Sequence, residues 1–346
     1  MTKDEIIDYD SLWDSYIKCR RRVSWKPSTK YYIINAIEET DKMCNRLSNG
    51  TWKNSKARPI HISYPKPRDG LSIPFKDRIY QRSINDNELY PNITNSFIFD
   101  NCACQIGKGP DFARRRLKQF LWNFYCNYGL DGVVTQIDIH GYYSSMQHKL
   151  VKDVFSEYLD KDVLQMTSDV LDTQYSGEIG YCPGSQMVQI AGISVLNSVD
   201  HFIKEQLHIR YFIRYMDDFF ILTHDREQAQ RDLNKITEKL NSIGFSTNKS
   251  KTKITELSKG FTFLGFDYRI TDTGKIIMLL NSDNIKHEKK KLYKVSVRVK
   301  NGTMTREKAD IMYDAWKANA KRGNHYNLIK RMDAYYKSLW EVKDVS

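Results

Sequence analysis

Apolar residues recur along the chain with two different periods, and together they predict a mixed α+β protein. Short β-branched or apolar runs predict strands at residues 133–139, on both sides of a tight turn within 209–222, and in a hairpin formed by 261–270 and 275–280. Apolar residues at helical spacing predict helices elsewhere. These are 11–49 as one or two helices, 77–89, 111–128, 149–159, 189–207, 228–243, and three helices in roughly the last 60 residues, divided near Asn301 and Gly323.

Two segments rich in proline and glycine connect these elements. Residues 57–74 contain four prolines and an Asp69-Gly70 turn signal, which predict a hairpin or loop that carries basic side chains. Residues 107–110 precede the helix predicted at 111–128, and Gly129 ends it. No internal repeat or low-complexity linker interrupts the chain, so we expect continuous structural units.

Charge is distributed unevenly over the 346 residues, whose formal net charge is +12. Residues 53–82 hold eight basic and two acidic side chains, 108–118 hold five and one, and 285–346 hold sixteen and seven, whereas the remainder is net acidic. Lysine-rich helices are often merely solvated faces. Three basic runs around an acidic middle also suit a protein that binds a polyanion and holds metal ions at its centre.

The composition argues against several classes of protein. The longest wholly aliphatic run, residues 276–280, is much shorter than the roughly 20 apolar residues needed to cross a bilayer. The N-terminus is acidic and does not resemble a secretory leader. Six cysteines in a chain of this length indicate reduced thiols and neither a disulfide framework nor a zinc site. We therefore expect a folded cytoplasmic protein with no membrane partner.

Three aspartates are the strongest candidates for chemistry. Asp217 and Asp218 fall in the turn between two apolar runs, which lets neighbouring carboxylates serve one site, and Asp138 ends an earlier strand. Carboxylates that converge on a sheet edge repel each other unless divalent cations lie among them. The structural alternative is a solvent-exposed Asp-Asp turn together with an Asp138 that caps the next helix.

The motifs around these aspartates resemble those of reverse transcriptases, in particular the bacterial stand-alone enzymes derived from retroelements. The catalytic turn is matched by Arg214-Tyr215-Met216-Asp217-Asp218-Phe219, and the preceding motif by Gln136-Ile137-Asp138-Ile139-His140-Gly141-Tyr142-Tyr143. The other matching blocks, in family order, are 66–68 with 76–81, 107–109, 180–189, 244–253 and 263–266. The resemblance covers about residues 55–340 and implies a right-hand polymerase with fingers, a palm with an antiparallel sheet, and a helical thumb. It implies N-terminal helices and fingers at 1–130, palm with interleaved fingers at 131–270, and the end of the primer-grip hairpin with the thumb at 271–346.

The resemblance also implies an activity and a set of roles. The activity is RNA-directed DNA polymerisation by two-metal phosphoryl transfer, with two Mg²⁺ ions and Mn²⁺ as a substitute. Metal ligands would be Asp138, Asp217, the more weakly engaged Asp218, and the backbone carbonyl of Ile139, while Lys251 would be a proton donor near the pyrophosphate. Nucleotide contacts would come from Lys66, Arg68, Tyr143, Gly184 and Gln189. Primer and template contacts would come from Tyr215, Met216, Phe263, Leu264, Gly265, Lys289 and Lys290.

Some of these positions have equally simple structural interpretations, and two depart from the family. Tyr143 would place a ring against the sugar 2′ carbon and select deoxynucleotides, yet a tyrosine at a helix start is also a common core residue. Lys251 could be a solvated loop lysine, and Gly184 and Gln189 could be turn and cap residues. Relatives often have serine where this chain has Val188, and arginine after the glycine where it has Leu71. The triphosphate contact is assigned to Lys66 and Arg68.

The implied partners are an RNA template, a DNA or RNA primer and deoxynucleoside triphosphates, with an accessory protein or a second copy as further candidates. A dedicated noncoding RNA copied in antiphage defence is the favoured role. A diversity-generating retroelement is the alternative, although those enzymes usually have Gly-Asn where this chain has Gly184-Ser185. A different class of function is an RNA-binding scaffold or toxin-like protein with a vestigial polymerase site. Template-independent DNA addition also remains open.

Overall fold

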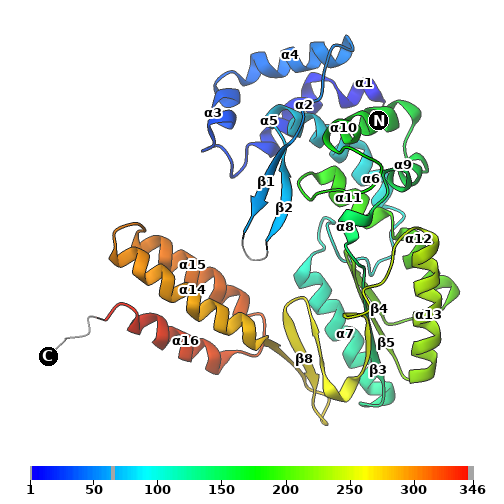
Figure 1. The fold of residues 1–346 in the computed structure, drawn as a ribbon, viewed down its shortest axis with the longest axis vertical. Helices are drawn as coiled ribbons and strands as arrows, with labels where there is room; N and C mark the ends of the chain where they lie inside the picture. The colour runs from blue at the N-terminus through cyan, green and yellow to red at the C-terminus, as the bar shows by residue number, and fades with distance from the viewer. Residues whose placement is uncertain (1, 64–66, 342–346) are drawn as a thin grey trace. The chain divides into compact units, whose positions relative to one another are not determined.

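The protein is described by a computed structural model that covers residues 2–63 and 67–341. The chain divides into two compact units. The first consists of Met1–Ala113, Gln136–Ile221 and Gln230–Lys253, and the second of Arg114–Thr135, Leu222–Ala229 and Ile254–Ser346. Helices and antiparallel strand pairs are mixed along the chain, so the predicted α+β class is confirmed (Figure 1).

The first unit begins with short helices. They are α1 (Lys3–Ile6), α2 (Tyr9–Cys19), α3 (Pro27–Ile34) and α4 (Ala36–Ser48). The Asp8 carboxylate caps α2 by accepting a hydrogen bond of 2.7 Å from the Ser11 amide. Three helices thus occupy the region where one or two were predicted, because residues 20–26 form turns and Pro27 begins α3 at a position that needs no amide donor.

The next segment is a hairpin followed by a helix with an irregular end. Strands β1 (Arg58–Ile62) and β2 (Arg68–Ser72) pair antiparallel from Arg58–Ser72 to Ile62–Arg68, which confirms the predicted hairpin. The turn signal at Asp69-Gly70 is wrong, because both residues lie within β2 and pair with His61 and Ile60. Helix α5 (Phe75–Ile84) passes into the π-helical turn η1 (Asn85–Leu89) and then into α6 (Tyr90–Thr94). Single π turns are frequent at functional sites.

A four-stranded sheet has the order β4-β5-β3-β6. Its strands are β3 (Val133–Asp138), β4 (Phe212–Tyr215), β5 (Asp218–Thr223) and β6 (Lys253–Glu256). The predicted strand before Asp138 and the predicted strand pair around the Met216-Asp217 turn are both confirmed. Buried Phe212 and Phe219 stack with ring centroids 5.8 Å apart and help to hold β4 against β5.

The first unit contains further helices. They are α8 (Tyr142–Ser145), α9 (His148–Ser156), α10 (Lys161–Gln174), α11 (Gln186–Ser194), α12 (Asn197–His201), the π turn η2 (Phe202–Gln206) and α13 (Arg226–Ser242), whose first residues lie in the second unit. The prediction missed α10. The single helix predicted at 189–207 is wrong, because Ser185 caps α11 and the chain leaves helical geometry at Leu196. The Ser194 hydroxyl donates to the Ala191 carbonyl just before this break.

The second unit contains most of α7 (Pro110–Tyr128), the 3-10 turn η3 (Leu257–Lys259) and a three-stranded antiparallel sheet. Its strands are β7 (Phe261–Phe263), β8 (Phe266–Ile270) and β9 (Ile276–Leu280), in the order β7-β8-β9. The hairpin predicted from 261–270 and 275–280 is confirmed by the antiparallel pairing of β8 with β9, but its first strand is divided into β7 and β8. Leu264 and Gly265 both have positive φ, +46° and +81°, and form a tight turn that reverses the chain.

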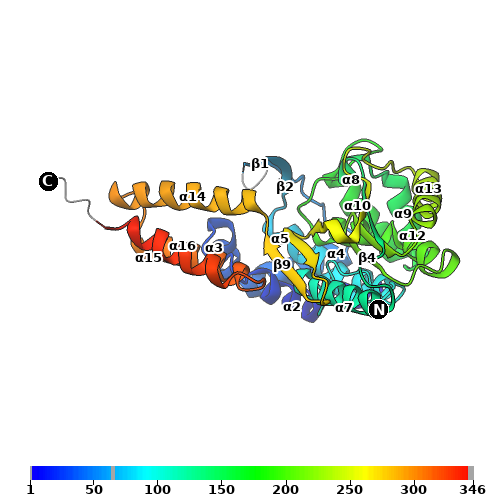
Figure 2. The ribbon, with the colours of Figure 1, turned by 90° about the horizontal axis from the view of Figure 1, so that it is seen from below.

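The C-terminal part of the second unit is a bundle of three helices, as predicted. Helices α14 (Ser282–Lys300), α15 (Arg306–Ala320) and α16 (Tyr326–Ser338) run side by side in Figure 1 and Figure 2. Leu292, Tyr313, Met332 and Tyr336 form the bundle core. No helix among the described residues is long and apolar enough to span a lipid bilayer.

Candidate active site

Asp138 occupies the end of β3, at the point where the chain turns away. The Asp138 carbonyl accepts a 2.7 Å hydrogen bond from the Asn248 amide, and His140 donates from its amide to the Ser246 carbonyl at 2.9 Å. Gly141 has a φ of +54°, and a Cβ there would lie 2.7 Å from the Ser144 hydroxyl oxygen. The strand therefore ends directly after Asp138, with its carboxylate 17% exposed.

Lys251 binds this carboxylate. Its Nζ lies 3.1 Å from Oδ1 and 3.2 Å from Oδ2 of Asp138. The neighbouring Thr252 hydroxyl accepts a hydrogen bond of 3.3 Å from the Asp138 amide. Lys251 therefore pairs with Asp138 although its side chain is 62% exposed, and its role as a proton donor stays a prediction.

Asp217 projects from the two-residue turn between β4 and β5. Tyr215 pairs with Asp218 across the turn, and Met216 has a φ of +57°, a conformation that residues other than glycine rarely adopt. Arg214 Nη1 donates to the Met216 carbonyl at 2.9 Å. Strained residues of this kind persist where the surrounding structure fixes them, and here a charged side chain does so.

Arg214 itself is held by a buried carboxylate. Its Nε and Nη2 each lie 2.6 Å from an oxygen of Asp200, Nη2 also donates to the Ile193 carbonyl at 2.8 Å, and both side chains are 0% exposed. Sequence reasoning did not single out Asp200. The signal was an arginine in an otherwise apolar strand, because a buried guanidinium requires a carboxylate partner.

The electrostatics of the aspartates fit hard cations. Burial raises the pKa of Asp217, the charge of Asp138 raises it further, and Lys251 and Arg214 oppose this change. Two carboxylates that disfavour each other's charge, next to a backbone carbonyl, form an oxygen donor set of the type that Mg²⁺ prefers. Ile139 forms an antiparallel bridge with Thr247, and the two backbone hydrogen bonds of this bridge involve the Asp138 carbonyl and the His140 amide. The Ile139 carbonyl takes no part in these two hydrogen bonds.

Asp218 follows Asp217 directly in the sequence. It begins β5 and is exposed to solvent. Within residues 2–63 and 67–341, no group of three or more His, Cys, Asp or Glu side chains is arranged to hold a metal ion. The metal-ligand roles of Asp138, Ile139, Asp217 and Asp218 therefore all stay predictions.

Tyr143 lies in contact with α11. A Cβ on Gly192 would come within 2.8 Å of the Tyr143 hydroxyl oxygen, so the absence of a side chain at Gly192 makes room for the ring. The Tyr143 carbonyl accepts a 2.8 Å hydrogen bond from the Tyr181 amide. Burial raises the pKa of Tyr143, and the charges of Cys104 and Asp217 raise it further.

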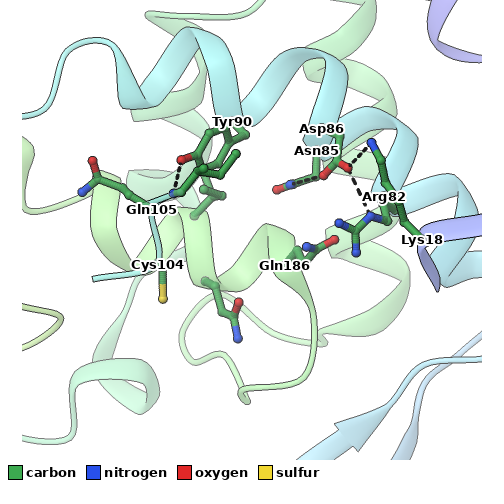
Figure 3. A pocket seen from close by; sticks show the side chains of 11 residues that line it. Lys18, Arg82, Asn85, Asp86, Tyr90, Cys104, Gln105 and Gln186 are labelled. Carbon is green, nitrogen blue, oxygen red and sulfur yellow. Dashed lines mark hydrogen bonds and ion pairs between the residues drawn. The ribbon is translucent and has the colours of Figure 1, made fainter. Parts of the chain in front are cut away.

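Two adjoining cavities contain the predicted residues Gly184 and Gln189. The larger, of about 450 Å³, is lined by Lys18, Arg82, Asn85, Asp86, Tyr90, Cys104, Gln105, Ile106, Gln186, Gln189 and Ile190. The smaller, of about 230 Å³, shares Arg82, Gln186 and Gln189 with it and adds Arg78 and Gly184. Figure 3 shows Lys18 and Arg82 reaching the same carboxylate of Asp86, at 3.0 and 3.1 Å, with Gln186 pointing toward Arg82. The basic residues Lys18, Arg78 and Arg82 were not predicted as site residues.

The packing of the structure explains why position 184 is a glycine. A Cβ at this position would lie 2.5 Å from the Leu71 carbonyl oxygen on β2. Its predicted close approach is therefore to a strand of the same chain, and an approach to a base pair remains untested. The loop that carries Gly184 and the hairpin that carries Leu71 pack together because of it.

The remaining predicted residues lie elsewhere. Lys66 is outside the described residues, and Arg68 pairs through its backbone with Ile62 in the β1–β2 hairpin. Phe263, Leu264 and Gly265 form the β7–β8 turn of the second unit, where Arg114 Nη2 donates to the Leu264 carbonyl at 3.2 Å. Lys289 and Lys290 lie on α14, with Lys289 Nζ 5.4 Å from the centre of the Tyr335 ring.

Two comparisons with known proteins found similarities. Residues 127–268 match the family model described as reverse transcriptase (RNA-dependent DNA polymerase), which is a nucleotidyltransferase domain. A solved telomerase from Candida albicans, in complex with a fragment of telomeric RNA, is similar with a TM-score of 0.50 and 13% identity, over 70% of this chain and 49% of that chain. This chain thus spans about half the length of that telomerase, and the likeness shows the right-hand polymerase fold. No curated protein matches the sequence.

Proposed function

We propose that the chain is an RNA-directed DNA polymerase whose active site is built on Asp138 and Asp217. The observation that supports this most directly is that both aspartates fall inside the matched reverse transcriptase segment and interact electrostatically, as the raised pKa of Asp217 indicates. A scaffold with a vestigial site has no need for two carboxylates that destabilise each other.

Divalent metal ions complete the proposed site. Bound Mg²⁺ would stabilise the charge that develops on the oxygens of an in-line phosphoryl transfer. Asp138, Asp217 and the Ile139 carbonyl would hold the ions, with Asp218 as the weaker contributor. Lys251 neutralises Asp138 through their ion pair and could later donate a proton to the leaving pyrophosphate.

The substrate contacts follow from the same unit. Tyr143 would exclude the ribose 2′-hydroxyl with its ring, because its hydroxyl and ring are packed against Gly192 and have little freedom to move away. The cavities around Arg82, Gln186 and Gln189 would hold the nucleotide or the template base beside it, with Lys66 and Arg68 as triphosphate contacts. Tyr215 and Met216 would face the primer end.

The second unit would hold the duplex. The Leu264-Gly265 turn beside Phe263 would support the primer, and Lys289 and Lys290 on α14 would contact phosphates. On this basis residues 1–130 contain the fingers with the N-terminal helices, 131–270 the palm and interleaved fingers, and 271–346 the thumb. Template, primer and deoxynucleoside triphosphates are the proposed ligands.

For the biological role we propose cytoplasmic synthesis of DNA on a dedicated noncoding RNA in antiphage defence. The feature that favours this role over diversity generation is Ser185, because diversity-generating enzymes usually have asparagine at this position. The Ser185 hydroxyl accepts a hydrogen bond of 3.2 Å from the Val188 amide and caps α11. Sequencing of the RNA and DNA that co-purify with the protein from its host tests this role. Complementary DNA of a repeat with errors at adenines would favour diversification instead.

The polymerase proposal is tested by primer extension on an RNA template with Mg²⁺. Asp217→Asn should abolish incorporation, while thermal unfolding and RNA binding remain close to wild type. Lys149→Ala, which removes a lysine from an exposed ion pair with Asp153, is the control that should keep full activity. Wild-type extension rates in the Asp217→Asn protein would refute the assignment.

A further inference from the structure

A strongly basic surface lies in the first unit, outside the polymerase site. Residues 20–37 contain five basic and no acidic side chains. All five are exposed, and within the described part of the chain none of them is in an ion pair. We call this region the α3 surface, and its exposed members are Arg20, Arg21, Arg22, Trp25, Lys26, Lys30, Tyr31, Ile34 and Ile37. By contrast, nearby Lys18 is neutralised by Asp86.

Aromatic rings are interleaved with these cations. Trp25 is 69% exposed and Tyr31 is 59% exposed. The Trp25 indole nitrogen donates to the Arg22 carbonyl at 3.2 Å, which fixes the polar edge of the indole and leaves most of its surface to solvent. Lys26 Nζ lies 5.7 Å from the centre of the same ring. A fixed, exposed ring beside a cation is suited to stacking on a planar ligand.

Helix α3 has apolar side chains on both of its faces. On the inner face, Tyr32 is buried and lies 5.3 Å, centre to centre, from both Tyr16 and Phe75. On the outer face, Tyr31 and the 81% exposed Ile34 are one helical turn apart. Helices with apolar residues all round are usually buried, so the outer face of α3 has the character of a contact surface.

We propose that the α3 surface binds single-stranded nucleic acid, RNA or DNA, outside the polymerase site. Unpaired nucleotides offer base faces for Trp25 and Tyr31 together with phosphates for the arginines and lysines, and they do so at every step of the strand. A duplex offers the phosphates alone, because its bases are stacked on one another. This inference does not depend on catalysis, since none of its residues touches the aspartate site.

Other occupants fit the charge pattern less well. A second copy of the chain related by two-fold symmetry would bring five cations against five cations, which is strongly unfavourable. An anionic membrane would attract the cations and accept Trp25 and Ile34. The inner face of α3, however, already packs through Tyr32 against Tyr16 and Phe75. Membrane binding is therefore treated as an outcome of the test.

The experiment measures binding of fluorescein-labelled oligouridine and oligothymidine of about 12 nucleotides, a length within the range of known single-strand sites. The protein is first saturated with an unlabelled primer–template hairpin, so that the polymerase site is occupied. The double variant Trp25→Ala/Tyr31→Ala should weaken binding of the oligonucleotides by about tenfold or more, since base stacking on each ring contributes at least about fivefold. Tyr326→Ala, which removes an 80% exposed ring from α16, is the matched control and should bind like wild type.

Two further variants separate stacking from charge and from folding. Trp25→Phe removes the hydrogen bond to Arg22 but keeps a ring, and should retain most of the affinity. Arg20→Ala/Arg21→Ala should lower the slope of log affinity against log salt by about 0.7 for each phosphate that the variant no longer neutralises. Unchanged oligonucleotide affinity in the Trp25→Ala/Tyr31→Ala protein would overturn the proposal. It would also be overturned if wild type bound phosphatidylserine vesicles and the double variant lost this vesicle binding but still bound the oligonucleotides.

Discussion

Arg214 binds Asp200 through two hydrogen bonds of 2.6 Å, and neither side chain is exposed to solvent. Asp200 lies on α12, whereas Arg214 lies on β4, two residues before the strained Met216 whose carbonyl it also binds. The pair therefore connects a buried helix to the backbone of the catalytic turn. Because Arg214 binds the turn from which Asp217 projects, we propose that it positions Asp217.

Replacement of Arg214 by lysine should lower the maximal rate of nucleotide incorporation at least about tenfold, with a smaller change in KM. A lysine keeps the positive charge but cannot form the planar fork to Asp200 and the bond to the Met216 carbonyl at the same time. Steady-state primer extension measures both constants. Circular dichroism checks that the variant is folded. This control is needed because the pair also stabilises the fold: Asp200→Asn, which leaves the buried arginine without its carboxylate, should cost about 3–5 kcal/mol of unfolding free energy. Equal maximal rates in folded Arg214→Lys and wild type would contradict the positioning role.

Local patterns were sufficient to predict the strands that carry the aspartates. The β-branched run before Asp138 and the two apolar runs around Met216 and Asp217 each contain their own strand signal, since strand periodicity depends on neighbouring residues only. The three C-terminal helices were predictable for the same reason. The break of the 189–207 helix was not predictable, because apolar residues at helical spacing continue through the Leu196 turn.

Partners distant in sequence could not be predicted from patterns. Lys251 and Asp138 are 113 residues apart, and only the packed fold brings the ammonium group to the carboxylate. Likewise, Gly184 needs its missing side chain because of Leu71 on β2, a proximity that no local signal encodes. The uncompensated cations at residues 20–37 were hidden in the charge count, since acidic residues precede and follow them in sequence.

Tyr143→Ala should increase the use of ribonucleotides relative to deoxynucleotides by about tenfold or more, which corresponds to about 1.4 kcal/mol of discrimination. The ring is the only part of the side chain that the gate requires, so Tyr143→Phe should discriminate like wild type. The ratio of kcat/KM for the two sugars, measured with single-nucleotide incorporation, gives the result directly. If Tyr143→Ala and wild type share the same ratio, Tyr143 is a core tyrosine and not a gate.

The second unit should lose stability on mild acidification through His325. Its Nε2 accepts a 2.5 Å hydrogen bond from the Leu280 amide, and burial lowers its pKa below the ordinary value of 6.5. Near pH 6.5 the His325 imidazole therefore binds a proton in the unfolded chain but stays neutral in the folded chain. The free energy of unfolding consequently falls as the pH drops through that value. The contribution of one such group is at most about 1.4 kcal/mol per pH unit.

The contribution of His325 can be isolated with His325→Gln, which offers an acceptor for the Leu280 amide but does not titrate. Calorimetric unfolding of both proteins between about pH 7.5 and pH 5.5 should show a steeper loss of stability in wild type. The carboxylates of the chain titrate equally in the two proteins, so they cancel in the difference. Parallel curves over this range would show that His325 keeps its ordinary pKa.

Gly184→Ala should weaken nucleotide binding and stability together, because the added Cβ would lie 2.5 Å from the Leu71 carbonyl oxygen and the backbone must move. Overpacking of this kind typically costs about 1–3 kcal/mol. The loop also lines the cavity that contains Arg82 and Gln189, so KM for deoxynucleoside triphosphates should rise several-fold. Gly109→Ala is the matched control, since a Cβ at Gly109 meets nothing within 4 Å. If Gly184→Ala lowers the melting temperature but leaves KM unchanged, the packing against β2 is purely structural and the adjoining cavity does not bind the incoming nucleotide.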